Sequence, residues 1–298
     1  MLSKIYNLLN YCYEDSMTDK FAGIEFQLFI ISAKALIPYE DKVGCMFDTD
    51  RYKKEIEVFK YYRNGKDDTI DFYFKNNIIS DLEDNLIEYK IIPAIISNTF
   101  FNTIIEEVLK IVLFFTVNQN TIINAVILSA ALHEYFENSI SDIDNLKDKI
   151  KEKLIEFSLK DYLEKNNLRT LNKSYLIDFE KERIKAIIKN QYFSNEYSAK
   201  YKALQFIKND NNINNSANAI YEGHQEVINN FSAYLLKIRK GTLNPEKLKY
   251  KFDNVYDLKD YLNNSTFNHP LLGKCIILKK SKNEIILKNK LGLLRVNI

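Results

Sequence analysis

The sequence predicts a mostly helical fold, and three observations favour it. The 298 residues are 46% hydrophobic and 28% charged, a composition that can bury a large core. Glycine and proline, which punctuate sandwiches, barrels and alternating βα folds, number only 7 and 4. Apolar residues instead recur at helical spacing along most of the chain. The length exceeds one typical domain, so we expect one large domain or two unequal ones.

Two segments near the start carry the helical pattern clearly. Residues 21–37 are almost wholly apolar, which predicts a buried helix. This segment is too short for a membrane span and contains Glu25 and Lys34. Residues 50–62 place apolar side chains at helical spacing, and Asn64-Gly65 should end that helix.

The richest apolar stretch runs from Ile91 to Phe136. We expect Pro93 in the first turn of a helix that continues to Val117, because proline is tolerated where no helical N–H bond is needed. A polar break at 118–120 should precede a second helix over 121–136, whose small residues allow close packing. Two antiparallel buried helices would form the centre of the domain.

The second half continues as amphipathic helices. Residues 142–165 predict a charged helix pair on a solvated face, and residues 178–208 predict a further helix. The apolar stripe of that further helix consists of Ile184, Ile187, Ile188 and Tyr192. The low-complexity segment 209–218 should be a loop, and a last helix over 220–240 should end at Gly241.

After Asn244-Pro245 the hydrophobic pattern changes from helical spacing to short apolar segments typical of strands. Residues 274–281, 283–289 and 292–298 predict a three-stranded β-meander with a turn at 281–283. We therefore place a domain boundary near Gly241. It separates an all-helical domain, 1–241, from a small basic element, 242–298.

Charge is distributed unevenly along the chain. Residues 237–298 contain 14 Lys and Arg against 5 Asp and Glu, a balance of +9 (14 − 5). The whole chain carries +2, so the first 236 residues carry −7 (2 − 9). A basic element of this kind could bind nucleic acid or another anionic partner, or could be a lysine-rich solvated surface.

Cysteine and histidine give little sign of a metal or nucleophilic site. The three cysteines are odd in number and far apart, and the first residues show no signal-peptide pattern, so we expect a cytoplasmic protein. The three histidines lack metal-ligand spacing. We expect His133 to be a satisfied core or rim residue, His224 to be exposed and His269 to lie in a turn.

Adjacent carboxylates are candidate ligands for a metal ion. Asp67-Asp68-Thr69 could chelate Mg²⁺, because hard cations prefer oxygen ligands. The simpler interpretation is that Asp67 or Asp68 caps the following helix. Asp48 and Asp50, on either side of Thr49, have the same interpretation.

Within residues 84–137, Pro93 ends the segment DNLIEYKIIP, and Thr116-Val117 follows later in the same stretch. In order, spacing and hydrophobic pattern, this stretch resembles part of the ADP-ribosylglycohydrolase family, which has G-S-x-M-R-x-x-P where the first segment lies and a Thr-His pair at the distance of Thr116-Val117. Thr18-Asp19 lies where the family has its T-D-D-T metal motif, and Asp210 through Asn212 lies near its D-A-D-T motif. The likeness covers about residues 10–220.

The resemblance implies a compact, orthogonal multi-helix bundle that hydrolyses ADP-ribose linkages with two Mg²⁺ ions. Asp19 and Asp210 would be the metal ligands and catalytic carboxylates, with Thr18, Lys90 and Asn212 contacting the ligand. Lys20, however, stands where a second ligand is expected, and Val117 replaces the family's histidine. Two divalent ions need several anionic oxygens. The sequence therefore predicts a degenerate member with a lost or weakened Mg²⁺ site.

Three hypotheses about function follow. The chain is a degenerate ADP-ribosylglycohydrolase that binds or weakly hydrolyses an ADP-ribose-type ligand. Alternatively, it is a non-enzymatic helical interaction protein whose basic C-terminal element binds a protein or nucleic acid. A third hypothesis is an enzyme that uses Asp67, Asp68 and Thr69. We expect no membrane partner.

Overall fold

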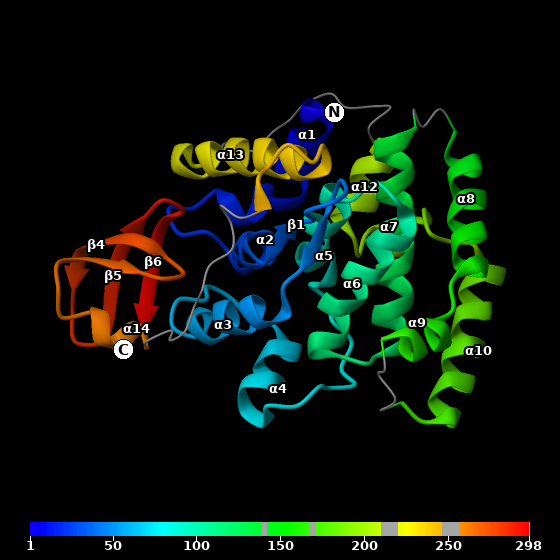
Figure 1. The fold of residues 1–298 in the computed structure, drawn as a ribbon, viewed down its shortest axis with the longest axis horizontal. Coiled ribbons are helices and arrows are strands. Elements are labelled where there is room, and N and C mark those ends of the chain that lie inside the picture. Colours follow the sequence, from blue (N-terminus) through cyan, green and yellow to red (C-terminus); the bar gives the residue numbers. More distant parts are fainter. Residues whose placement is uncertain (139–141, 167–170, 210–219, 246–256, 298) are drawn as a thin grey trace. The chain divides into compact units, whose positions relative to one another are not determined.

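The computed structural model describes residues 1–138, 142–166, 171–209, 220–245 and 257–297. These residues are mostly helical, with a small antiparallel sheet near the C-terminus (Figure 1). The chain divides into two compact units. Unit 1 comprises Met1–Lys66, Ile92–Ser97 and Asn214–Ile298, and unit 2 comprises Asp67–Ile91 and Asn98–Ile213.

The helices and strands of unit 1 come from both ends of the chain. Its helices are α1 (Leu2–Tyr13), the 3₁₀ helix η1 (Glu14–Met17), α2 (Ile24–Lys34), α3 (Thr49–Phe59), α13 (Glu222–Arg239) and α14 (Leu258–Tyr261). Its strands are β1 (Leu36–Pro38), β2 (Cys45–Phe47), β3 (Thr266–His269), β4 (Gly273–Lys280), β5 (Glu284–Asn289) and β6 (Gly292–Asn297).

Unit 2 is all helical in its described residues. Its helices are α4 (Asp68–Asn76), α6 (Phe101–Phe115), α7 (Gln119–Glu137), α8 (Ile143–Glu156), α9 (Leu159–Lys165), α10 (Lys173–Lys189), α11 (Asn195–Ser198) and α12 (Lys202–Asn209). Helix α5 (Ile87–Ser97) contributes residues to both units.

The division into units differs from the expected boundary near Gly241, because the C-terminal sheet is joined to N-terminal helical segments. The backbone N–H of Asn297 donates to the carbonyl of Tyr61 at 2.9 Å. Phe21 and Leu293 form a parallel β-bridge. Residues 1–66 and the sheet therefore belong to one unit.

The sheet has four antiparallel strands in the order β3-β4-β5-β6. The three predicted strands are present as β4, β5 and β6. The prediction missed β3, which is short and contains Thr266, Asn268 and His269, so its sequence lacks the apolar signal of a strand. It also missed the two-stranded pairing of β1 with β2.

Helix α7 is the centre of unit 2 and packs against α6, α8, α10 and α12. The predicted small residues Ala125, Ser129, Ala130 and Ala131 are fully buried. Asn118 caps the helix by accepting the Thr121 N–H at 3.0 Å. The predicted pairing of this helix with the preceding one is confirmed (Figure 1).

Several local predictions are confirmed. Helices α2 and α3 occupy the apolar segments 21–37 and 50–62, and α8 and α9 form the charged pair. Gly241 adopts a left-handed conformation, with φ of +64°, after α13. The loop expected at 209–218 lies almost wholly outside the described residues.

Two helix predictions are wrong. Pro93 lies inside α5 rather than in the first turn of a long helix, and extended backbone at Asn98 separates α5 from α6. The segment 178–208 forms three helices instead of one. Within its expected apolar stripe, Ile184 and Ile188 are 49% and 76% exposed, whereas Tyr192 is buried.

The prediction that His224 is exposed is also wrong. Its side chain is fully buried on α13, and Nδ1 lies 3.3 Å from the Met17 carbonyl. Burial lowers the pKa of this imidazole. His133 is half-buried, with Nε2 3.1 Å from the Thr99 carbonyl, in agreement with its predicted rim position. His269 ends β3, and its Nδ1 accepts backbone N–H groups from the turn that follows.

None of the described helices combines the length and apolar character that crossing a membrane requires. The cysteines Cys12, Cys45 and Cys275 are free thiols and buried.

Candidate functional site

The residues proposed from the family resemblance fall in different parts of the chain. Thr18 and Asp19 follow η1 in unit 1 and are exposed, and the Thr18 hydroxyl donates to the Asp15 carbonyl at 3.3 Å. Lys90 belongs to α5 in unit 2. Asp210 and Asn212 lie outside the described residues.

Lys90 is the centre of a buried charge cluster in unit 2. Its fully buried ammonium lies 2.6 Å from a carboxylate oxygen of Asp67 and 2.6 Å from one of Asp84. It also donates to the Thr69 hydroxyl at 3.2 Å. The Lys90 ammonium is therefore held by side chains of its own unit. A phosphate therefore cannot reach the Lys90 ammonium. The carboxylates beside this ammonium offset the cost of removing its charge from water, which explains how the lysine can be buried.

The two aspartates of this cluster differ in acidity. Burial raises the pKa of the Asp67 carboxyl, but the Lys90 ammonium more than offsets this effect and holds the pKa below its usual value. Burial keeps the pKa of Asp84 above its usual value despite the same ammonium. One lysine therefore balances one aspartate, and the second aspartate retains its proton more readily.

Asp67 has the capping role that the sequence analysis gave as its simpler interpretation. Its Oδ1 accepts the backbone N–H groups of Thr69 and Ile70, each at 3.0 Å, at the start of α4. Asp48 caps α3 in the same way by accepting the Arg51 N–H. Within the described part of the chain, no three His, Cys, Asp or Glu residues are grouped so that they could hold a metal ion.

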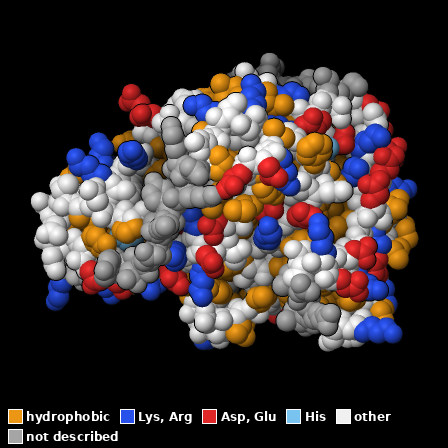
Figure 2. Space-filling model, in the orientation of Figure 1, with side chains coloured by type: hydrophobic (Ala, Val, Ile, Leu, Met, Phe, Trp, Pro, Cys, Tyr) orange, Lys and Arg blue, Asp and Glu red, His pale blue; other side chains and the backbone are white. Residues whose placement is uncertain are grey.

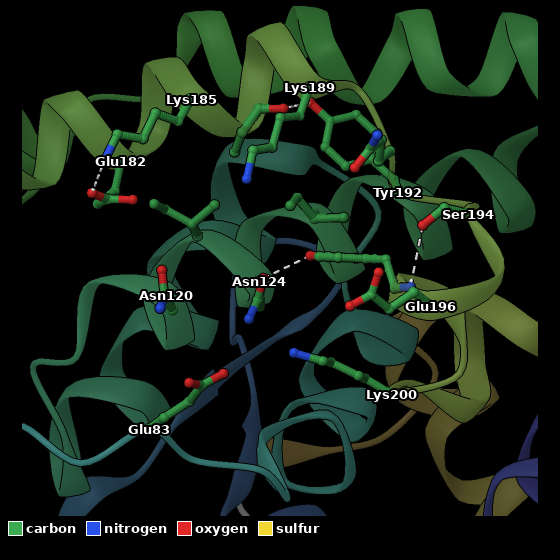
Figure 3. Close-up of a pocket in the computed structure, with 15 residues that line it drawn as sticks. Glu83, Asn120, Asn124, Glu182, Lys185, Lys189, Tyr192, Ser194, Glu196 and Lys200 are labelled. Carbon is green, nitrogen blue, oxygen red and sulfur yellow. Dashed lines mark hydrogen bonds and ion pairs between the residues drawn. The ribbon is translucent and has the colours of Figure 1, made fainter.

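A pocket of about 350 Å³ lies elsewhere in unit 2, among α7, α10 and α11 (Figure 3). Ile123, Ile127 and Tyr192 contribute buried apolar surface to it. Asn120 and Asn124 lie on α7 at the same four-residue spacing as the two isoleucines, so one helix supplies both apolar and amide groups.

Four charged side chains around this pocket have no ion-pair partner among the described residues. Lys189, at the end of α10, and Lys200, which follows α11, direct their ammonium groups into the pocket from opposite sides (Figure 3). Glu83 and Glu196 contribute two carboxylates. In contrast, the neighbouring Lys185 is paired with Glu182 at 2.6 Å. The pocket thus offers both donors and acceptors for charged groups.

Two tyrosines hold the pocket wall in place. The Tyr197 hydroxyl donates to Asn124 Oδ1 at 2.6 Å, and the Tyr192 hydroxyl donates to the Ala186 carbonyl at 3.2 Å. Burial raises the pKa of Tyr192 to about 12 and raises that of Tyr197 well above its usual value. Both phenols are therefore neutral at physiological pH, and they link α7 and α10 to the segment 190–200.

Glu88 connects α5 to the start of α12. Its carboxylate accepts the backbone N–H groups of Lys202 at 3.0 Å and Ala203 at 3.1 Å. Burial nevertheless raises the pKa of this carboxyl to about 7. The ring of Tyr201 lies 5.6 Å from that of Tyr197, so the pocket wall and the Glu88 contact belong to one segment of chain.

Sequence reasoning missed this pocket because it depends on the break in the expected helix 178–208. The turn after Lys189 brings Tyr197 to α7 and Tyr192 back onto α10, and no local motif marks these contacts. One available signal was the polar pair Asn120 and Asn124 in an otherwise apolar helix.

Comparisons of this chain with protein-family models, curated proteins and solved structures gave no match.

Proposed function

We propose that unit 2 binds a small ligand of the ADP-ribose type, which combines phosphate with hydroxyl-bearing rings, in the pocket among α7, α10 and α11. The observation that supports this proposal is the pair of unpaired ammonium groups, Lys189 and Lys200, that face an apolar surface (Figure 3). An unpaired cation in a pocket is a ready partner for a phosphate, since lysine binds phosphate as a point charge.

The remaining groups fit the other parts of such a ligand. Carboxylates accept hydrogen bonds from ribose hydroxyls, and Glu83 and Glu196 supply two of them. Ile123 and Ile127 offer apolar surface to a base. Pockets for small molecules usually combine apolar surface with a few polar groups that orient the ligand.

The proposal concerns binding. Hydrolysis by the mechanism that the family resemblance implies would require the carboxylates of Asp19 and Asp210 together, and only Asp19 is among the described residues. Lys90, which was also carried over from the resemblance, is enclosed by Asp67 and Asp84 and takes no part in the proposed site.

Calorimetric titration with ADP-ribose, with and without Mg²⁺, tests the proposal. We expect binding in both conditions, and the variants Lys189→Gln and Lys200→Gln should each weaken it about tenfold, which corresponds to about 1.4 kcal/mol. Lys181→Gln is the matched control, because Lys181 lies on the same α10 and is paired with Asp178 at 2.8 Å. This control should bind like the unmodified protein.

A further variant blocks the pocket without changing its charge. Ala186 lines it from α10, so Ala186→Phe should abolish binding while the two Lys variants only weaken it. An absence of binding to the unmodified protein in either condition would refute the proposal. Binding that Lys189→Gln, Lys200→Gln and Ala186→Phe all leave unchanged would also refute it, because the ligand would then occupy another site.

A further inference from the structure

The C-terminal sheet carries a large excess of positive charge. Residues 266–297 contain seven Lys and Arg and one acidic residue, Glu284, a balance of +6 (7 − 1). All these residues are described, and they include every strand of the sheet.

Two of the seven cations have structural roles. Arg295 lies 3.5 Å from Glu284 and 4.5 Å from the centre of the Phe21 ring. Lys280 donates to the Leu262 carbonyl at 3.1 Å. The other five are exposed and form no hydrogen bond or ion pair with any described residue. They are Lys274, Lys279, Lys282, Lys288 and Lys290.

The register places three of these five lysines on one face of the sheet. Ile276 on β4 is opposite Lys288 on β5, so Lys274, two residues before Ile276, shares the face of Lys288. The pairing shifts between Ile277 and Lys279, and this irregularity places Lys279 opposite Ile286 on the same face. Regular alternation would have placed Leu278 opposite Ile286, and Lys280 instead of Lys279 on this face.

The two remaining lysines lie in the turns at the two ends of β5. Lys282 is in the turn between β4 and β5, and Lys290 is in the turn between β5 and β6. We call these five residues the basic face. The side chains of Ile276 and Ile286 lie between the three strand lysines, and Glu284, the one acidic residue among the described residues 266–297, is next to Arg295.

We propose that the basic face binds the phosphate backbone of duplex nucleic acid without regard to base sequence. Its five unpaired ammonium groups complement a polyanion, and lysines that contact phosphates carry no sequence information. Stacking on single-stranded bases requires aromatic side chains. The strand residues of the described sheet include two aromatic rings, Phe267 and the imidazole of His269, and both are buried on the opposite face.

Fluorescence anisotropy with two 20-base-pair duplexes of unrelated sequence, at 50 to 200 mM salt, tests this proposal on the full chain. Both duplexes should bind equally. If all five lysines contact phosphates, the logarithm of the binding constant should fall against the logarithm of the salt concentration with a slope of about −4.5. The triple variant Lys274→Gln, Lys279→Gln, Lys288→Gln should reduce that slope by about 3.

A second triple variant with the same change in net charge is the control. Lys149, Lys160 and Lys181 are each paired with an acidic residue one helical turn away. Figure 2 shows such mixing of acidic and basic side chains over α8 and α10. Changing these three lysines to glutamine should leave duplex binding nearly unchanged. Circular dichroism of both variants checks that they remain folded.

Three results would overturn the proposal. The first is an equal loss of binding in both triple variants, which would indicate a response to net charge alone. The second is tighter binding to a single strand than to the duplex. The third is the absence of duplex binding together with lysine-dependent binding to vesicles that contain anionic lipid, which would make the basic face a membrane contact.

Discussion

Replacing Glu88 with glutamine should change how the stability of the protein depends on pH. The Glu88 side chain is 1% exposed and accepts two backbone N–H groups at the start of α12. Burial disfavours its charged form strongly enough to raise its pKa to about 7, despite those two hydrogen bonds. Glutamine has nearly the same shape but does not titrate. Its NH2 group replaces one of the two oxygens that accept these N–H groups, a loss that does not depend on pH, so the change of the stability difference with pH isolates the effect of the charge.

The sign of the effect follows from the two protonation states. Between pH 4.5 and about 7, the unfolded chain has released the Glu88 proton while the folded protein still holds it, so stability falls as pH rises through this window. The full effect is about 3 kcal/mol, at 1.36 kcal/mol for each pH unit. A small part of this loss of stability has already occurred at pH 5. The stability of Glu88→Gln relative to the unmodified protein should therefore increase by about 2.5 kcal/mol between pH 5 and pH 8.

Urea unfolding followed by circular dichroism at pH 5, 6, 7 and 8 measures this difference. The exposed Glu152, which pairs with Lys149, provides the control Glu152→Gln, whose stability relative to the unmodified protein should stay nearly constant over the same range. A difference between Glu88→Gln and the unmodified protein that does not change with pH would show that Glu88 titrates normally. The argument from burial would then be refuted.

Three further changes should alter stability in the same urea assay. Lys90→Met removes the ammonium that lies against two buried aspartates and should cost at least about 3 kcal/mol; a loss below about 1 kcal/mol would contradict the buried cluster. The stability of His224→Gln relative to the unmodified protein should increase as the pH falls below 6.5, because burial lowers the folded pKa of His224 and the unfolded chain therefore takes up the proton first; a difference that does not change with pH would contradict this. Gly65→Ala should destabilise more than Gly273→Ala, because both positions have positive φ but only at Gly65 would a Cβ lie 2.7 Å from a neighbouring isoleucine; equal losses would argue against that clash.

Local sequence signals predicted those elements whose formation depends on neighbouring residues. The apolar run of α7, the capping aspartates and the glycine after α13 each have their cause within a few positions of the chain. The same kind of signal failed at Pro93, because proline is usual in a first turn yet here lies inside α5, and the helix ends instead at Asn98.

His224 shows that an available signal was misread. Its immediate neighbours in YEGHQE are polar, which suggested exposure. A helix buries residues by face, however, and His224 shares a face with Val227 and Ile228, three and four positions later, which are both buried. Spacing along α13 was therefore a better guide than the polarity of adjacent residues.

The candidate sites depend on contacts that no local pattern contains. Asp67, Asp84 and Lys90 meet because the fold brings the residue before α4 and the loop before α5 to one residue of α5, and the pocket exists because the chain turns after α10. The sequence predicted the cap that Asp67 forms but not its contact with Lys90, which was expected instead to bind a ligand. Only the folded structure shows that these two side chains form an ion pair.

Lysine illustrates why composition alone could not locate function in this chain. Lys90 is buried between two carboxylates, Lys181 forms a surface ion pair within α10, and Lys200 and Lys288 have no partner among the described residues. All four add the same charge to the sequence, yet only the last two can receive an anion without first breaking a contact. Both proposals depend on that distinction. The matched variants test it directly, because they remove equal charge from paired and unpaired lysines.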